Sequence, residues 1–573
     1  MADVFVSTQV GGMNTFTHPA YLDEATYHRG VNLSSRGGVL HTRPRFSRVA
    51  EQPVGRAQGT FAFFDRLYTV VSGKVYYAEG TLQTWNLVPG IHFSPYVSEI
   101  YATPVYGDYL FMNDGVHMPA IVGPYANRHL STQNDDPEIP SGTLCVFGQG
   151  RIFFFDRYKQ ILQAGDVYKP GDPESCLKFT EQAFLNESLS IDQPASYGEV
   201  RSMNFVKNMQ TGTGLGQLVV FYEGGACAYN VYEPRADWLN VQLGQSLFTL
   251  SGTGGAAFNA QINNDLFFRT DTGLTTLRDY STATNQGIRT LPISIPITPL
   301  LDRDQVWTLE PGSLAVDDNR VLFTSGLRID AGGDSYFDSI ISMDLASFYS
   351  GGDTQMTFDG FWTGPKMTKV FTGTYAGDTV TFITSKGEDN ANILWRFNED
   401  LMDDTDKSPR SRWYSRRMFF TNAFQYSRFV SAEIWFEEMR TDVSVKLYFR
   451  GESELWQEAS SGAFNVPYYD ADTCATDVDA THILPQGRAK VRIAVPEDAC
   501  DPVTKRQIRS ATSFQFCLEV TGVAAEPRMR FTAGDPAEGG EDPLCNSVNE
   551  EDILLTDAGS GCILYDYDLP FLT

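Results

Sequence analysis

The chain has 573 residues, and its 44 Lys and Arg against 71 Asp and Glu give a formal net charge of −27 at pH 7. So acidic a chain lacks the basic footprint with which proteins grip nucleic acid or an anionic membrane. This excludes tight electrostatic binding to nucleic acid or to an anionic membrane, but it does not exclude a protein that contacts nucleic acid only weakly. Aromatic residues make up 13% of the chain, and 50 Gly and 28 Pro interrupt it, which is typical of many short strands.

Residues 1–58 predict an extended arm. Glycine pairs and Pro44 interrupt this segment. Between Arg29 and Arg56 it contains six arginines and a single acidic residue, Glu51. The first residues, MADVFVSTQVGG, lack the basic flank and apolar run of a signal peptide. No apolar stretch in the chain reaches the roughly 18 residues of a membrane-spanning helix. We therefore expect a soluble protein that is synthesised in the cytoplasm.

An internal repeat occupies residues 59–405. Seven times, a turn residue and a polar residue precede three strand-forming positions, and a second turn and another short strand follow. The first strand positions of the seven copies are Leu67, Tyr109, Ile152, Leu218, Leu266, Val321 and Thr379. Strands and tight turns repeated in this way are typical of β-propeller blades, each of which buries one face on its neighbour. We predict an all-β fold with a propeller of about seven blades and insertions; an ordinary meander sandwich is the alternative.

A different pattern begins after Asp406 and predicts a C-terminal antiparallel β domain over residues 406–573. The segments RWYSRRMFF, FVSAEIWFE and DVSVKLYFRG alternate with period two, as half-buried strands do. The last 41 residues, Ala533–Thr573, hold ten acids and no Lys or Arg. We expect this acidic tail to stay extended or to dock on a basic partner surface.

Two groups of basic and aromatic residues are candidates for a subunit or partner interface. In a strand, the arginines of the run after residue 410 would split between two faces, which disfavours a nucleic-acid patch. Arg, Trp and Tyr are instead the usual anchors of protein interfaces. The candidate residues are Arg36, Arg43, Arg45, Arg412, Trp413, Tyr414, Arg416 and Arg417.

The motifs of catalysis and of cofactor binding are missing. The chain has no P-loop, no G-x-S-x-G elbow and no H-E-x-x-H, and its seven histidines are scattered without ligand spacing. The segment DADTCATDVDATH, with Asp470, Asp472, Asp477 and Asp479, is the best calcium candidate, but it lacks the glycine and the final acid of an EF-hand loop. Eight cysteines without a C-x-x-C pair favour free, mostly buried thiols. We expect no enzyme activity, no cofactor and no metal.

Several segments resemble a known family. They are G11-G12-M-N, G30-V-N-L, R36-G-G-V-L and R43-P-R-F in the arm, and RWYSRRMFFTNAF and FVSAEIWFE after the propeller. Over roughly residues 8–450 the chain is similar to the tail nozzle, or tail tubular protein B, of short-tailed bacteriophages (podoviruses). The patterns are loose, and the last 120 residues match nothing in that family.

The resemblance implies a structural virion protein, located in the tail. Six copies would form a tube below the portal and adaptor, hold the genome until infection and pass DNA on ejection. Tail adaptor, tail fibres or spikes, and the host envelope at infection would be the partners, and genomic DNA would pass without tight binding. Two other functions stay open: a propeller enzyme acting on host polysaccharide, and a receptor-binding spike module.

Overall fold

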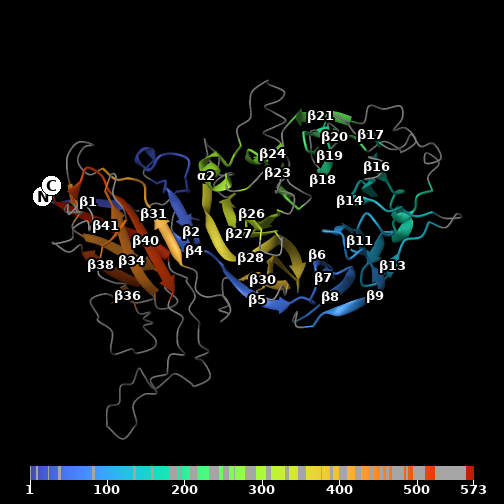
Figure 1. Cartoon of the computed structure of the whole chain (residues 1–573), viewed down its shortest axis with the longest axis horizontal. Coiled ribbons are helices and arrows are strands. Elements are labelled where there is room, and N and C mark those ends of the chain that lie inside the picture. Colours follow the sequence, from blue (N-terminus) through green and yellow to red (C-terminus); the bar gives the residue numbers. More distant parts are fainter. Residues whose placement is uncertain are drawn as a thin grey trace, which may run out of the picture.

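The protein is all-β and consists of a β-propeller joined to a set of C-terminal strands, as the computed structural model in Figure 1 shows. The structure describes residues 2–7, 11–23, 25–35, 40–80, 84–132, 137–156, 161–180, 191–192, 197–206, 216–231, 244–249, 257–262, 265–277, 292–302, 304, 312–329, 335–345, 357–375, 377–387, 392–398, 410–419, 427–429, 431–437, 443–451, 456–459, 464–466, 483–484, 488–494, 510–522 and 563–572. Among these residues, no helix is long and apolar enough to span a bilayer.

Blades 1 to 4 are separate four-stranded antiparallel sheets whose strands follow one another in the chain. Blade 1 consists of β6 (Ala57–Phe63), β7 (Arg66–Val71), β8 (Lys74–Ala78) and β9 (Asn86–His92). Blade 2 consists of β10 (Tyr101–Val105), β11 (Tyr109–Asn113), β12 (Ala120–Val122) and β13 (Asn127–His129). Blade 3 consists of β14 (Thr143–Gly148), β15 (Arg151–Asp156), β16 (Ile161–Ala164) and β17 (Ile191–Asp192). Blade 4 consists of β18 (Val200–Val206), β19 (Gln217–Tyr222), β20 (Gly225–Tyr229) and β21 (Gly244–Thr249).

Blades 5 to 7 complete the ring with less regular sheets. Blade 5 consists of β22 (Asn259–Ile262), β23 (Asp265–Thr270) and β24 (Gly273–Thr276). Blade 6 consists of β25 (Leu314–Asp317), β26 (Arg320–Ile329), β27 (Ser335–Asp344) and the first half of β28 (Thr357–Tyr375). Blade 7 consists of the second half of β28, β29 (Asp378–Lys386), β30 (Asn392–Asn398) and β5 (Arg45–Glu51). The seven repeat positions all lie in the second strand of a blade, which confirms the predicted propeller.

The turns that the repeat marks have the backbone that tight hairpins require. The turn residues Asp65, Gly150, Asn319 and Gly377 have φ values of 56°, 69°, 61° and 85°. Two-residue hairpin turns need such positive φ because their twist matches that of the flanking strands. Gly, Asn and Asp tolerate this conformation best, and these residue types made the repeat visible in the sequence.

A buried apolar cluster fills each boundary between neighbouring blades. Val70 of blade 1 packs with Leu110 of blade 2, and clusters of the same kind join the next blades. At the last boundary, Leu67 of blade 1 packs with Phe382 and Leu394 of blade 7. The ring is therefore closed by hydrophobic packing.

The N-terminal segment is extended, and its strands belong to distant sheets. Strand β5 is the outermost strand of blade 7, where it pairs with β30. Strand β2 (Arg29–Val31) lies between β28 of the propeller and β31 (Ser411–Tyr414) of the C-terminal part. Strands β31, β40 (Gln515–Gly522) and β34 (Val443–Arg450) continue the same sheet. The N-terminal segment thus closes the ring and also holds the C-terminal strands.

A second C-terminal sheet contains both ends of the chain, which lie together in Figure 1. Strand β41 (Ile563–Leu572) pairs with β1 (Ala2–Ser7), β32 (Ser427–Phe429) and β33 (Ser431–Glu437), and β33 also pairs with β38 (Arg488–Ala494). The prediction of an extended or externally docked tail is therefore wrong for residues 563–572, because their backbone groups pair with strands of the same chain. The rest of the tail lies outside the described residues.

Candidate functional site at the junction of the propeller and the C-terminal sheet

The short strand β2 joins the propeller to the C-terminal sheet. Val31 pairs in parallel with Phe361 of β28, and Gly30 and Val31 pair antiparallel with Trp413 and Arg412 of β31. Gly30 allows the close packing here, since a Cβ at this position would lie 2.9 Å from the Tyr27 ring. Backbone hydrogen bonds consequently run from blade 6 through β2 into the C-terminal strands without interruption.

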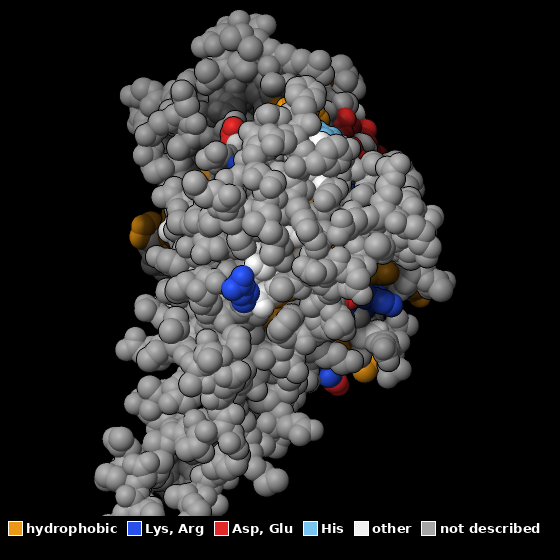
Figure 2. Space-filling model, turned by 90° about the vertical axis from the view of Figure 1, so that its left-hand side faces the viewer, with side chains coloured by type: hydrophobic (Ala, Val, Ile, Leu, Met, Phe, Trp, Pro, Cys, Tyr) orange, Lys and Arg blue, Asp and Glu red, His pale blue; other side chains and the backbone are white. Residues whose placement is uncertain are grey.

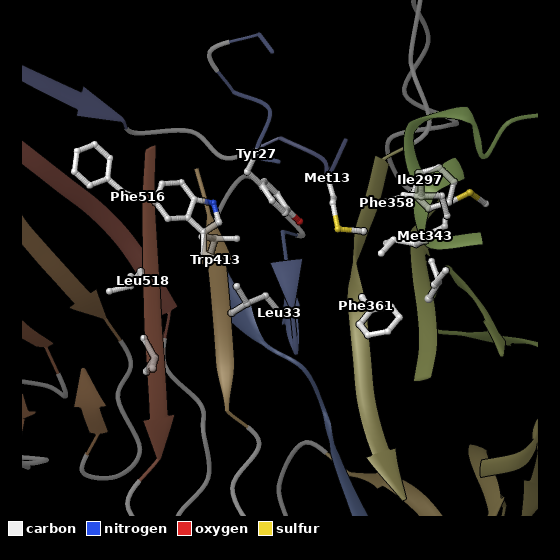
Figure 3. Close-up of a cluster of buried hydrophobic side chains, with 14 of the residues drawn as sticks. Met13, Tyr27, Leu33, Ile297, Met343, Phe358, Phe361, Trp413, Phe516 and Leu518 are labelled. Atoms are coloured by element: carbon white, nitrogen blue, oxygen red, sulfur yellow. The ribbon is translucent and has the colours of Figure 1, made fainter. Parts of the chain in front are cut away.

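Buried side chains from all these strands form one core at the junction. Figure 3 shows side chains from the N-terminal segment lying between those of β28 and those of β31 and β40. The residues concerned are Met13, Tyr27, Leu33, Phe358, Phe361, Trp413, Phe516 and Leu518. The neighbouring Trp362 is fully buried, and its indole Nε1 donates a hydrogen bond to the Leu33 carbonyl at 2.8 Å. The two parts of the molecule therefore share a hydrophobic core as well as a sheet.

An ion pair is buried beside this core. The Arg320 Nε lies 3.3 Å from the Asp359 Oδ2, and the Ser342 hydroxyl donates to the same oxygen at 3.1 Å. Arg320 also donates to the Ser34 hydroxyl of the N-terminal segment at 3.3 Å. Burial raises the pKa of Asp359 to about 6, although the Arg320 guanidinium opposes the shift. The junction thus contains a carboxyl group that changes charge in mildly acidic solution.

His28 is a second titratable group at the junction. Its backbone N–H donates to the Tyr414 carbonyl at 3.0 Å, which places it against β31. Burial, together with the nearby Arg450 and Arg29, lowers the pKa of His28 to about 4. At neutral pH, therefore, the His28 ring is uncharged.

The candidate arginines of the N-terminal segment lie partly in the core. Arg43 is only 3% exposed, donates to the Asn32 side chain at 3.2 Å, and stacks over the Phe46 ring at 3.8 Å. Arg45 lies in β5, and Arg36 lies outside the described residues. Arg43 is therefore not a surface anchor, because its guanidinium is enclosed within its own chain.

The run from Arg412 to Arg417 lies along β31 and just after it, with buried and partly exposed side chains in alternation. Trp413 belongs to the junction core, and Arg417 is buried and donates to the Gly451 carbonyl at 3.4 Å. The prediction that Trp413 and Arg417 contact a partner is wrong, because residues of the same chain cover both side chains.

Three residues of the run remain partly exposed. Arg412 forms a 2.6 Å ion pair with Glu519, Tyr414 packs edge-on against Trp456 with ring centroids 5.7 Å apart, and Arg416 is half-buried. In Figure 2, which faces this end of the molecule, the visible Lys and Arg side chains lie at separate points of the surface.

Three histidines that are separated in the sequence meet at the outer edge of blades 1 and 2. The His92 ring centroid lies 5.1 Å from that of His129 and 6.0 Å from that of His117. His129 accepts a hydrogen bond from the His92 backbone N–H at 3.1 Å, and its Nδ1 lies 2.9 Å from the Met118 carbonyl oxygen. The sequence analysis did not find this cluster, because the distance between His92 and His129 depends on how β9 and β13 lie beside each other. Nowhere in the described ranges do three His, Cys, Asp or Glu side chains form a set that could hold a metal ion.

The described cysteines have the properties of core residues. Cys145, Cys176, Cys227 and Cys517 are free thiols. Burial raises the pKa of Cys176 to about 11 and that of Cys517 to about 12, so these thiols stay protonated and weakly nucleophilic near pH 7. The other four cysteines and the calcium candidate at residues 470–479 lie outside the described residues.

Comparisons with known proteins find weakly similar structures and no family. No family model and no curated protein matches the sequence. The AfRom2 CNH domain matches at 10% identity with a TM-score of 0.37, over 62% of this chain and 99% of that one. The WD40 β-propeller domain of Doa1 matches at 9% identity with a TM-score of 0.30, over 61% of this chain and 97% of that one. With scores this low, the fold assignment depends on the strand pairing described above.

Proposed function

We propose that this chain is a structural, non-enzymatic virion protein, the tail nozzle of a short-tailed bacteriophage. The observation that carries the proposal is the junction, where β2 makes the propeller and the C-terminal strands one continuous sheet. A wall subunit needs such a connection, because domains on flexible linkers move relative to one another. The segments that resemble the nozzle family, around residues 11–12, 30–46 and 412–437, include the strands that build this junction.

In the proposed assembly, six copies form a tube below the portal and adaptor, and fibres or spikes attach to it. The genome passes through the tube on ejection, when the tail meets the host envelope. The net charge of −27 supports this role, because a negative wall repels phosphate groups and keeps DNA from adhering. We assign the contact between subunits to the partly exposed residues Arg412, Tyr414 and Arg416.

Electron microscopy of virions tests the proposal directly. We expect the chain in a six-fold ring at the tail, below the adaptor. A three-fold spike would favour the receptor-binding alternative. Release of sugar from a host glycan by the purified chain would favour the polysaccharide-degrading alternative. Either result would overturn the nozzle proposal.

A charge reversal tests the proposed contact. Arg416→Glu is expected to abolish tail assembly, whereas the control Arg328→Glu, on a 48% exposed side chain of β26, is expected to leave it intact. Melting temperatures of both purified variants exclude a failure to fold. Normal infectious particles from the Arg416→Glu variant would contradict the assigned contact.

A further inference from the structure

Large aromatic side chains are exposed on one face of blades 1 to 3. Phe64 lies in the β6–β7 turn, Tyr106 in the β10–β11 turn and Tyr125 in the β12–β13 loop, and their exposed fractions are 50%, 60% and 78%. Tyr168, in the segment after β16, is half-buried beside them. We call these four residues the aromatic arc. Exposed aromatic groups of this kind mark interaction sites more often than isolated apolar residues do.

The arc consists of two pairs of rings, each of which joins two neighbouring blades. Phe64 packs edge-on against Tyr125 of the next blade, with ring centroids 6.3 Å apart, and Tyr106 packs against Tyr168 of the blade after that at 4.7 Å. Within blade 2, the two loops touch, since a Cβ on Gly123 would lie 2.9 Å from the Asp108 carbonyl oxygen. The rings therefore support one another and lose little freedom when a partner binds.

The backbone under two of these rings is strained. Phe64 and Tyr106 have φ values of 50° and 46°, in the left-handed region that bulky residues rarely adopt. At the same first position of the turn, blade 3 has Gln149 and blade 6 has Asp318, with φ values of 49° and 39°. The tight turns between these strands require this conformation, and in blades 1 and 2 they hold an aromatic ring in solvent where blades 3 and 6 have a polar side chain.

Acidic side chains surround the arc. Asp108 accepts a hydrogen bond from the Tyr168 hydroxyl at 3.0 Å, and Asp65 accepts one from the Gly377 backbone N–H at 3.3 Å. Glu79 holds the cation Arg66 in a 2.7 Å ion pair, and Lys169 is an exposed cation beside Tyr168. The acids of this face are Asp65, Glu79, Asp108, Asp172 and Asp378. Among the described residues of these turns and loops, they outnumber the cations Arg66, Arg128 and Lys169, and Arg128 is paired with Glu138 and Glu174, so the face is negative as well as aromatic.

We propose that the aromatic arc is a docking surface for a cationic protein segment rich in arginine. Guanidinium groups stack on aromatic rings and pair with carboxylates, and this face offers both. The charge complementarity selects the partner, because a neutral or acidic segment would gain nothing from the surrounding acids. This inference does not depend on the nozzle proposal.

Binding of a fluorescent (Arg-Gly)5 peptide to the full-length chain tests the inference. Tyr125→Ala and Tyr106→Ala are each expected to weaken binding about tenfold, as exposed aromatic anchors do. The matched control is Tyr96→Ala, whose side chain is 86% exposed. Tyr96 follows Phe93, whose N–H donates to the Gly73 carbonyl of the β7–β8 turn, and thus lies on the opposite face. The control should bind like the unmodified chain, and a (Lys-Gly)5 peptide should bind more weakly, since lysine lacks the planar group that stacks on rings.

Several results would overturn the inference. Equal binding of the (Arg-Gly)5 peptide by the Tyr125→Ala, Tyr106→Ala and Tyr96→Ala variants would mean that the peptide binds only through the overall negative charge of the chain. Binding of a neutral glucan oligosaccharide that Tyr125→Ala abolishes, with peptide binding unchanged, would assign the arc to carbohydrate. Self-association that Tyr125→Ala abolishes, again with peptide binding unchanged, would assign it to a second copy. Melting temperatures check that the variants fold, which is expected because the replaced side chains are exposed.

Discussion

Blades 1 to 4 and the junction are both held by strand pairing, but they differ in how far apart the paired strands lie in the sequence, and only the junction includes a parallel pair, β2 with β28. Blade 3 pairs strands that all lie between Thr143 and Asp192, with a buried cluster on each side. The junction pairs Val31 with Phe361 and Arg29 with Tyr414, more than 300 residues away. Local pairing forms early and can be recognised in sequence, whereas distant pairing requires most of the chain to be in place. The comparison teaches that the propeller and the C-terminal strands are joined by a few pairings between residues that lie far apart in the sequence.

The largest effect is expected from Trp362→Ala. The fully buried indole is lost from the core, and the Leu33 carbonyl loses its donor, so we expect a loss of about 3–5 kcal/mol of unfolding free energy. Hydrogen exchange should also become faster in β2 and β40. The control Phe153→Ala, at an equally buried position of blade 3, should leave β40 protected. Faster exchange confined to blade 6 in the Trp362 variant would contradict the coupling.

The next effect concerns the buried Asp359. Its pKa of about 6 in the folded protein lies above the ordinary value of 3.8, so the folded state holds the proton more tightly. The stability from this group is present below pH 3.8 and is lost as the pH rises to about 6. The full change is about 3 kcal/mol for a shift of about two pK units. Asp359→Asn should remove this fall in stability, as measured by urea unfolding at several pH values. An unchanged pH profile would contradict the assignment.

Within the ring, Tyr222→Phe should have a smaller and more local effect. The hydroxyls of Tyr222 and Tyr229 are hydrogen-bonded at 2.8 Å in the buried part of blade 4. Removing the Tyr222 hydroxyl leaves the buried Tyr229 hydroxyl with one hydrogen bond fewer, which costs about 1–2 kcal/mol. Hydrogen exchange is expected to change in blades 3 and 4 and not in β2. A change in β2 would mean that the blades are coupled as tightly as the junction.

The smallest effect is expected from His28→Asn. The pKa of His28 is about 4 in the folded protein, below its ordinary 6.5, so its stability contribution is present above pH 6.5 and lost as the pH falls towards 4. This change runs opposite to that of Asp359. The variant should therefore lose more stability than the unmodified chain as the pH rises from 4 to 6.5, and unfolding curves of the two chains would reveal the difference. The effect is small because the ring is partly exposed to solvent.

The sequence predicted those parts of the fold that repeat locally. Leu67, Tyr109 and the five equivalent positions could be recognised because each lies next to its own turn and its own partner strand. Arg43 and Trp413 were assigned to an interface, although both are buried, because their covering residues come from distant segments. The histidine cluster was missed for the same reason. Alternation along β31 could be read from the sequence, but which neighbours cover each face could not.

The place of β5 in blade 7 has a consequence for synthesis on the ribosome. Strand β5 emerges early, and its partner β30 follows roughly 340 residues later. At about 5–20 residues per second, this interval lasts roughly 20–70 s. Throughout that time β5 exposes an unpaired edge on which newly made chains could pair with one another. The strand is short and its sequence, RFSRVAE, contains two arginines and a glutamate. These charged side chains disfavour pairing between the exposed edges of two chains during this interval.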